Sequence, residues 1–454
     1  MRHDGGSTMP ARRYDLDWLR VIAIVLLLYF HTGMIFVSEW GFHIKNPETS
    51  PLLLEVNFFL SRWRMALLFF ISGVGTSFAL RRRTAAQYVG ERARRLLVPL
   101  AFGMLVIVPP QIYFERLANG ASYASYLDFY PEVFRFVPYP EGAFSWHHLW
   151  FIFYLFGYSV IALPLFLYLR GEAGRRWAGR IGRAVRGPGL YALALPLGLV
   201  LAALIVRYPG PQNIVDDWAS LIYYFLFFVY GYVLHVAGAW DVIETRRRTS
   251  LTLAFLATLA IDTLRWNDAT PEFTYSAANT GYYLLQAFNA WCWVLAILGY
   301  GRRYLNRPSR FLERANEGIY PFYILHQTVI VAVGFYVIRV EEGILAKYLF
   351  TSTVSLAVSW ALYDLLVRPV PVLRFLFGMK PPRPTTYAAP ALSRSGPPAG
   401  VVDASPGRAG RAGRAGRAGS ADGVVPGAAA PASAPAPEAA WEVRRRVRIE
   451  PETP

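Results

Sequence analysis

The sequence predicts an all-α protein that crosses a membrane several times, and two observations support this fold class. Hydrophobic residues make up 54% of the 454-residue chain and aromatic residues 16%. Many of them gather in runs that approach the ~20 apolar residues needed to span a bilayer as a helix. Basic residues cluster between alternate runs, which is the pattern of cytoplasmic loops in multi-pass membrane proteins.

Ten apolar runs are predicted as membrane spans. The first follows Arg12 and Arg13 and so resembles a signal peptide, but it is too long and no small-residue cleavage site follows it. We therefore expect it to be a retained helix. The seventh run is short and carries Asp262 near its end. The predicted spans are residues 17–37, 55–80, 95–114, 148–169, 190–207, 218–238, 250–265, 278–300, 317–338 and 345–367.

The formal net charge of +16 is explained by membrane topology rather than by nucleic-acid binding, so no nucleic-acid partner is expected. Arginine-rich connections follow the second, fourth, sixth and eighth runs, whereas the connections between them are poor in Lys and Arg. The positive-inside rule places the basic connections, and with ten spans both termini, in the cytoplasm. We expect a multi-pass protein of the plasma (inner) membrane, surrounded by the lipid bilayer.

Composition divides the chain into three parts. Residues 1–13 are expected to form a cytoplasmic segment, and residues 14–379 the transmembrane domain. From 380 to 454 Ala, Gly, Pro and Arg dominate, and because such a tail cannot bury a core we expect it to be disordered and cytoplasmic. The single cysteine, Cys292, excludes an intramolecular disulfide and argues against a cysteine-based metal site.

Arg20 and His31 are the strongest functional signal in the sequence. Ten apolar residues separate them, so on a helix they point to nearly the same side and lie about 16 Å apart along the axis. An ionisable residue inside a bilayer is costly and marks a functional site by default. We expect His31 to act as a general base and Arg20 to hold phosphates at the inner mouth. The alternatives are a satisfied core histidine and a topology anchor.

Four further arginines are candidates for binding. Arg62 and Arg64 lie near the outer end of the second span, where they must find partners or water. We predict that they bind substrate; the alternatives are pairing with neighbouring carboxylates such as Glu39 and Glu55 and snorkelling to the interface. Arg92 and Arg95 share a helical face before the third span. With Arg20 they could form a basic pocket for a polyanionic cofactor, with ordinary inner-loop charge as the alternative.

Two further histidines, His148 and His326, are candidates for the cavity that His31 faces, as substrate-binding residues. His148 opens the fourth span on the outer side beside His147; adjacent residues point about 100° apart, so at most one of the two faces a given cavity, and an interfacial cap is the alternative for the other. His326 lies near the middle of the ninth span. Three histidines could bind a metal, but their spacing is not diagnostic of a metal site, and no metal is expected. Pro99 predicts a local irregularity in the third span.

The common fingerprints of soluble enzymes are absent from the sequence: G-x-S-x-G, the P-loop, H-E-x-x-H and G-x-G-x-x-G. Five motifs follow one another along the chain: the R-x10-H pair Arg20 and His31, FFISG at 69–73, R-x-x-R-x-x-x-P at Arg92, Arg95 and Pro99, HLWFI at 148–152 and YILHQTVI at 323–330. In this order they resemble the acyltransferase-3 family of multi-pass membrane acyltransferases over about residues 14–367. The HLWFI stretch is similar to the branch of periplasmic glucan succinyltransferases.

The resemblance implies an enzyme that moves an acetyl or succinyl group from cytoplasmic acyl-CoA to a hydroxyl of an extracytoplasmic sugar or glycan. It implies that the CoA phosphates meet Arg20, Arg92 and Arg95. The thioester would then arrive near His31, which acts as general base or carries the acyl group briefly. The alternative is an exporter of a polar or anionic metabolite, with Arg20, Arg62 and His31 lining its cavity. The sequence shows no internal repeat, which favours the enzyme.

Overall fold

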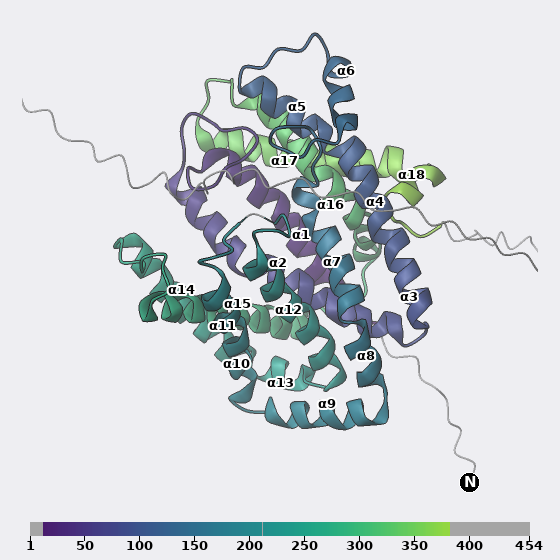
Figure 1. The fold of residues 1–454 in the computed structure, drawn as a ribbon, viewed down its shortest axis with the longest axis vertical. Coiled ribbons are helices and arrows are strands. Elements are labelled where there is room, and N and C mark those ends of the chain that lie inside the picture. Colours follow the sequence, from purple (N-terminus) through teal and green to yellow (C-terminus); the bar gives the residue numbers. More distant parts are fainter. Residues whose placement is uncertain (1–11, 211, 382–454) are drawn as a thin grey trace, which may run out of the picture. The chain divides into compact units, whose positions relative to one another are not determined.

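The structure is a computed structural model that describes residues 12–210 and 212–381. Within these residues the chain is helical and contains no extended β-strand, so the predicted all-α class is confirmed (Figure 1). The predicted tail of residues 380–454 lies, apart from its first two residues, outside the described part. So does most of the predicted N-terminal segment, residues 1–13.

The helices follow one another with short connections. The longer ones are α1 (Tyr14–Gly33), α2 (Pro51–Leu80), α3 (Ala85–Arg92), α5 (Pro109–Ala118), α7 (Trp150–Ile161), α8 (Leu163–Arg170), α9 (Glu172–Ala184), α11 (Ala194–Leu204), α12 (Trp218–Val236), α14 (Arg247–Trp266), α15 (Ala277–Tyr304), α16 (Arg310–Val337) and α17 (Ile344–Leu362). Short α-helices are α4 (Val98–Phe102), α6 (Tyr126–Phe129), α10 (Gly189–Ala192), α13 (Trp240–Thr245) and α18 (Pro371–Leu376). The 3-10 segments are η1 (Met34–Phe36), η4 (Tyr130–Arg135) and η5 (His147–Leu149), and the π segments are η2 (Ala93–Leu97), η3 (Gly103–Ile107) and η6 (Tyr363–Val367).

Seven helical segments of the described chain are long and apolar enough to cross a membrane, or nine if each of two bent pairs counts as one span. The bends are 48° between α7 and α8 and 113° between α9 and the α10–α11 segment. The predicted span 250–265 forms α14 but is not among these segments; its helix carries four charged residues among 20, which lower its mean hydropathy. A multi-pass protein is therefore confirmed, whereas ten spans and the orientation of the termini stay predictions.

Local sequence signals explain where the helices near the centre begin. The Ser50 side chain accepts a hydrogen bond from the Leu53 backbone N–H at 3.3 Å, and Pro51 occupies the first position of α2. An N-cap serine followed by proline satisfies the first turn of a helix, where backbone donors have no partner. Thr84 and Gln87 form a capping box at the start of α3.

Helix α1 lies inside the bundle, where it contacts α2, α15, α16 and α17 (Figure 1). At the end where α1 begins, its Tyr14 backbone N–H donates to Asn306, just beyond α15, at 3.2 Å. At its other end the chain turns back through residues 37–50 and enters α2. We name these two ends of the bundle the Arg20 end and the Gly33 end.

Two π segments interrupt the third span, as Pro99 predicted. Segment η2 ends immediately before α4, whose second residue is Pro99, and η3 follows α4. Proline has no N–H and crowds the preceding turn, so the helix widens locally. Such π segments often occur at functional sites, and η2 carries Arg95.

Helices α2 and α12 approach each other closely through a pair of glycines. A Cβ atom on Gly73 would overlap the carbonyl oxygen of Phe228, and one on Gly231 would overlap that of Phe70. Gly73 ends the FFISG motif, and Phe69 and Phe70 of the same motif are fully buried. Small residues let membrane helices approach closely, so packing explains this motif.

Replacing Gly73 by Ala should destabilise the protein by about 1–3 kcal/mol, because the added methyl group meets backbone that cannot move aside as a side chain would. Thermal unfolding of the purified protein in detergent measures the effect. Gly75→Ala is the matched control, since its Cβ would have nothing within 4 Å, and alanine favours the helix. An equal loss of thermal stability in both variants would contradict the packing role.

Candidate functional site

Five of the seven histidines of the chain gather in one place near the Gly33 end. They come from α1, the connection before α2, η5 and α16, so segments almost 300 residues apart meet here. Ring centroids lie 5.2 Å apart for His31 and His326, 5.3 Å for His148 and His326, and 4.6 Å for His43 and His147. We name this group the histidine cluster, with the members His31, His43, His147, His148 and His326.

The hydrogen bonds of His326 determine the tautomer of His31. Nδ1 of His326 lies 2.6 Å from the Tyr323 carbonyl oxygen, which can only accept, so Nδ1 carries the proton. Nε2 of His326 therefore accepts from Nδ1 of His31 at 3.0 Å. This leaves the lone pair of His31 on Nε2. An imidazole held by a second group in this way is oriented as a general base.

His148 presents a second imidazole lone pair beside His326. Its Nε2 lies 3.0 Å from the Ile324 carbonyl oxygen, so the proton is on Nε2. The residue is only 6% exposed, and its buried Nδ1 has no hydrogen-bond partner in the described residues. A buried polar atom without a partner requires an explanation, and a substrate donor group would supply the partner.

Arg64 is a buried guanidinium without an ion-pair partner among the described residues. It is 2% exposed, and its Nε and Nη1 have no hydrogen bond. Its Cζ lies 3.9 Å from the centre of the Phe30 ring, and its charge acts on both His31 and His326. Leaving a buried charge unpaired is strongly unfavourable, so Arg64 is a candidate for stabilising negative charge at this site.

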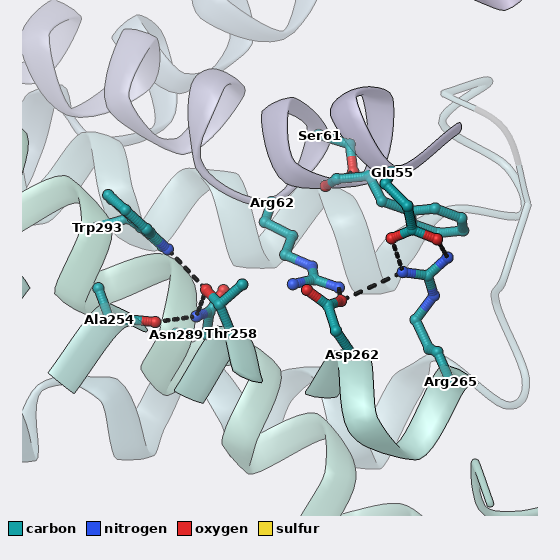
Figure 2. A network of polar contacts seen from close by, with 10 residues as sticks. Glu55, Ser61, Arg62, Ala254, Thr258, Asp262, Arg265, Asn289 and Trp293 are labelled. Atoms are coloured by element: carbon teal, nitrogen blue, oxygen red, sulfur yellow. Dashed lines mark hydrogen bonds and ion pairs between the residues drawn. The ribbon is translucent and has the colours of Figure 1, made fainter. Parts of the chain in front are cut away.

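Arg62, only two residues earlier, has a different environment (Figure 2). Its Nη2 lies 2.5 Å from an Asp262 carboxylate oxygen of α14, which Arg265 also contacts at 3.2 Å. Arg265 in turn makes a two-pronged contact with Glu55 at 2.8 and 3.1 Å. Residues two apart on a helix point to different sides. Arg62 therefore lies in a network that joins α2 to α14, away from the histidine cluster.

The arginines predicted to bind CoA lie at the Arg20 end. Arg92 donates to the Tyr88 hydroxyl at 3.2 Å and to Thr76 at 3.1 Å. Arg95 donates to the Gly378 carbonyl at 3.2 Å, and its charge interacts with that of Arg92. Arg20 is ion-paired with Asp17. The structure thus brings Arg92 and Arg95 together, while the described contacts of Arg20 do not include either of them.

Sequence reasoning missed a polar chain that reaches the cluster from α5. Gln111 donates to Thr328 at 2.7 Å, and Gln327 donates both to Gln111 at 3.0 Å and to Nε2 of His43 at 3.2 Å. His43 then donates from Nδ1 to Glu115 at 2.5 Å. Gln327 directly follows His326 in the YILHQT motif. This position is the one signal in the sequence that pointed to these hydrogen-bonded side chains.

His43, Glu115 and His147 also offer a set of possible metal ligands, with one ligand atom from each lying within 4.8 Å of the others. Two imidazoles and a carboxylate suit a divalent ion such as zinc. In the structure, however, the Gln327 amide occupies the lone pair of Nε2 of His43, so its Nδ1 carries a proton toward Glu115. These hydrogen bonds alone account for the close approach of His43 and Glu115.

The described part of the chain is thus a bundle of helices long and apolar enough to cross a membrane, with an oriented histidine beside a buried arginine. A family model described as an acyltransferase domain matches residues 13–364. The chain belongs to this acyltransferase-3 family, and it is a multi-pass membrane acyltransferase.

Similar proteins include glucans biosynthesis protein C from Salmonella heidelberg, Salmonella typhi and Salmonella typhimurium. Each is 22% identical over 394 residues, which cover 83% of this chain and 97% of the relative. No solved structure matches the chain.

Lys45, in the connection at the Gly33 end, predicts a pH dependence of stability. Its ammonium donates to the carbonyls of Met34 and Val37 at 2.7 and 2.6 Å, yet burial lowers its pKa to about 8 from the ordinary 10.5. Between these two values the unfolded chain binds more protons than the folded protein. Its free energy of unfolding therefore rises with pH in this window.

Thermal unfolding of the wild type and of Lys45→Met at pH 7.5 and pH 10 tests this prediction, because methionine has no proton to lose. The wild type should gain unfolding temperature relative to the variant as the pH rises. A constant difference between the two proteins, or a change in the opposite direction, would contradict the lowered pKa.

Proposed function

We propose that this acyltransferase moves an acyl group, acetyl or succinyl, from cytoplasmic acyl-CoA to a hydroxyl of an extracytoplasmic glycan. The observation that carries the proposal is the His31–His326 pair beside the unpaired Arg64. A glycan acceptor is supported by the name of the relatives, glucans biosynthesis protein C. The basic Arg20 end and the positive-inside rule support a cytoplasmic donor in the plasma (inner) membrane.

In the proposed reaction, Nε2 of His31 takes the proton of the acceptor hydroxyl while its oxygen attacks the thioester carbonyl. A C–O bond forms, the tetrahedral intermediate collapses, and the C–S bond breaks. The leaving CoA thiolate then receives the proton from His31, which restores the neutral imidazole. His326 holds the His31 ring in the tautomer that this step requires. A transient acyl-His31 is the alternative, in which Nε2 attacks the thioester itself and another base takes the proton of the acceptor hydroxyl.

Arg64 stabilises the negative charge that develops on the carbonyl oxygen. Its buried Nε–H and Nη1–H groups have no partner among the described residues before the reaction, so they can be directed at an oxyanion without first breaking another hydrogen bond. A donor fixed in a water-poor site is worth far more than one in water. This role explains why the structure retains a costly unpaired charge next to His31.

The donor would reach His31 along α1 from the Arg20 end. Helical rise places Arg20 and His31 about 16 Å apart, which is comparable with an extended pantetheine arm. Arg92 and Arg95 lie at the same end, where their positive charge suits phosphates. Acyl-CoA and the glycan are thus the proposed partners, and no metal takes part in the proposed step.

His31→Ala should lower acyl transfer by at least about 100-fold, because it removes the general base. Binding of acetyl-CoA or succinyl-CoA, measured as thermal protection of the detergent-purified protein, should persist. His326→Ala should also lower the rate, since His31 loses its orienting partner. Full transfer by His31→Ala would contradict the mechanism, and protection by sugars but by no acyl-CoA would favour the exporter.

Arg64→Met should lower kcat by about 100- to 1,000-fold, the usual effect of losing one oxyanion donor, with a smaller change in KM for acyl-CoA. Arg64→Lys should restore part of the rate, because it keeps the charge but not the two N–H groups. Steady-state kinetics separate the two parameters. A raised donor KM with unchanged kcat would show that Arg64 binds an anionic group of the donor instead.

A further inference from the structure

A pocket of about 340 Å³ opens at the Gly33 end, next to the histidine cluster. It is formed where the connection after α1, the C-terminal end of α5 and the C-terminal end of α16 meet. The residues that give it polar character are His43, Lys45, Glu115, Asn119 and Arg339. None of these residues takes part in the proposed step.

Two sets of contacts join this pocket to His31 and His326. Phe42, which lines the pocket, lies between two histidines, with ring centroids 6.2 Å from His31 and 5.2 Å from His43. The second set is polar, because Gln327 donates to His43 and directly follows His326 in α16. A molecule in the pocket is therefore one aromatic ring away from the proposed base.

The pocket offers hydrogen-bond acceptors and donors in a form that suits hydroxyl groups. Glu115 accepts from His43 at 2.5 Å and from the Tyr139 hydroxyl at 2.5 Å, so a phenolic hydroxyl already occupies one position on this carboxylate. Each carboxylate oxygen has more than one acceptor position, which leaves capacity for a further hydroxyl. The side chains of His43 and Glu115 are 10% and 15% exposed, so they are shielded yet reachable.

The positive charges beside the pocket are already engaged. Lys45 donates to two backbone carbonyls, and Arg339 donates to the Phe335 carbonyl and stacks on its ring. A free anion would have to compete with these contacts and with Glu115. The pocket therefore favours a neutral, hydroxyl-rich ligand over an anionic one, as carboxylate, amide and aromatic groups together suit a sugar.

We propose that this pocket is the acceptor site and binds a neutral saccharide through its hydroxyls, with Glu115 as the principal binding group and His43 holding that carboxylate in place. The proposal rests on the acyl transfer proposed above: because acyl-CoA would reach His31 from the Arg20 end, the acceptor hydroxyl would approach from the Gly33 end. It assigns acceptor recognition to residues outside the R-x10-H pair.

The test compares donor and acceptor parameters in Glu115→Gln. Acyl-CoA binding by the purified protein, followed by thermal protection, should equal that of the wild type. The KM for a neutral gluco-oligosaccharide should rise at least tenfold, while kcat at saturating acceptor changes much less. Glu342→Gln is the matched control, because Glu342 is an exposed carboxylate after α16 and does not line the pocket.

A second variant covers the case in which Glu115→Gln does not fold. Asn119→Ala changes an exposed residue of the pocket rim and should raise the acceptor KM several-fold. An unchanged acceptor KM in both folded variants, or in Asn119→Ala alone when the other is unfolded, would overturn the proposal.

Two further measurements separate the possible failures. Calorimetric binding of the oligosaccharide without any donor tests the pocket even if the protein transfers no acyl group, and binding that Glu115→Gln weakens tenfold supports it. Elemental analysis of the purified protein should find no stoichiometric zinc. One zinc per chain that is lost in Glu115→Gln would show a metal site at His43, Glu115 and His147 and overturn saccharide binding by this carboxylate.

Discussion

The hydrogen bond between His31 and His326 is the interaction on which the site depends. It joins α1 to α16 inside the bundle and, through the Tyr323 carbonyl, determines which nitrogen of His31 can take a proton. A histidine in a membrane span is costly unless it is paired, and here the second histidine meets that need while leaving one lone pair available. The packing of α1 against α16 therefore also determines the orientation of His31, the proposed base.

The two arginines of α2, Arg62 and Arg64, differ in whether they find a charged partner. Arg62 finds a carboxylate on α14, and the resulting network holds two helices together (Figure 2). Arg64 finds an aromatic ring but no carboxylate among the described residues. Since an unpaired buried charge is retained at a cost in stability, its position beside His31 is best explained by the charge that acyl transfer creates. In the proposed reaction, one helix thus supplies both a structural arginine and one that stabilises the developing charge.

The two ends of the bundle are suited to different molecules. At the Arg20 end, Arg92 and Arg95 lie together near π segment η2, and at the Gly33 end a pocket with a carboxylate reaches the histidine cluster. His31 lies between them, at the level where an arm extending from one end could meet a hydroxyl from the other. Such an arrangement would let an acyl group cross the membrane while its carrier stays on one side.

The sequence by itself determined the helical membrane class and the shared face of Arg20 and His31, because apolar length and helical periodicity are local properties. Its ordered motifs also indicated the family. It also pointed to His148 and His326 as candidates. It did not distinguish Arg62 from Arg64, and it did not reveal His43, Glu115 or Gln327. Only the tertiary structure decided these points, since whether a charge is paired depends on which helices lie side by side, and a periodic pattern carries no information about distances between helices.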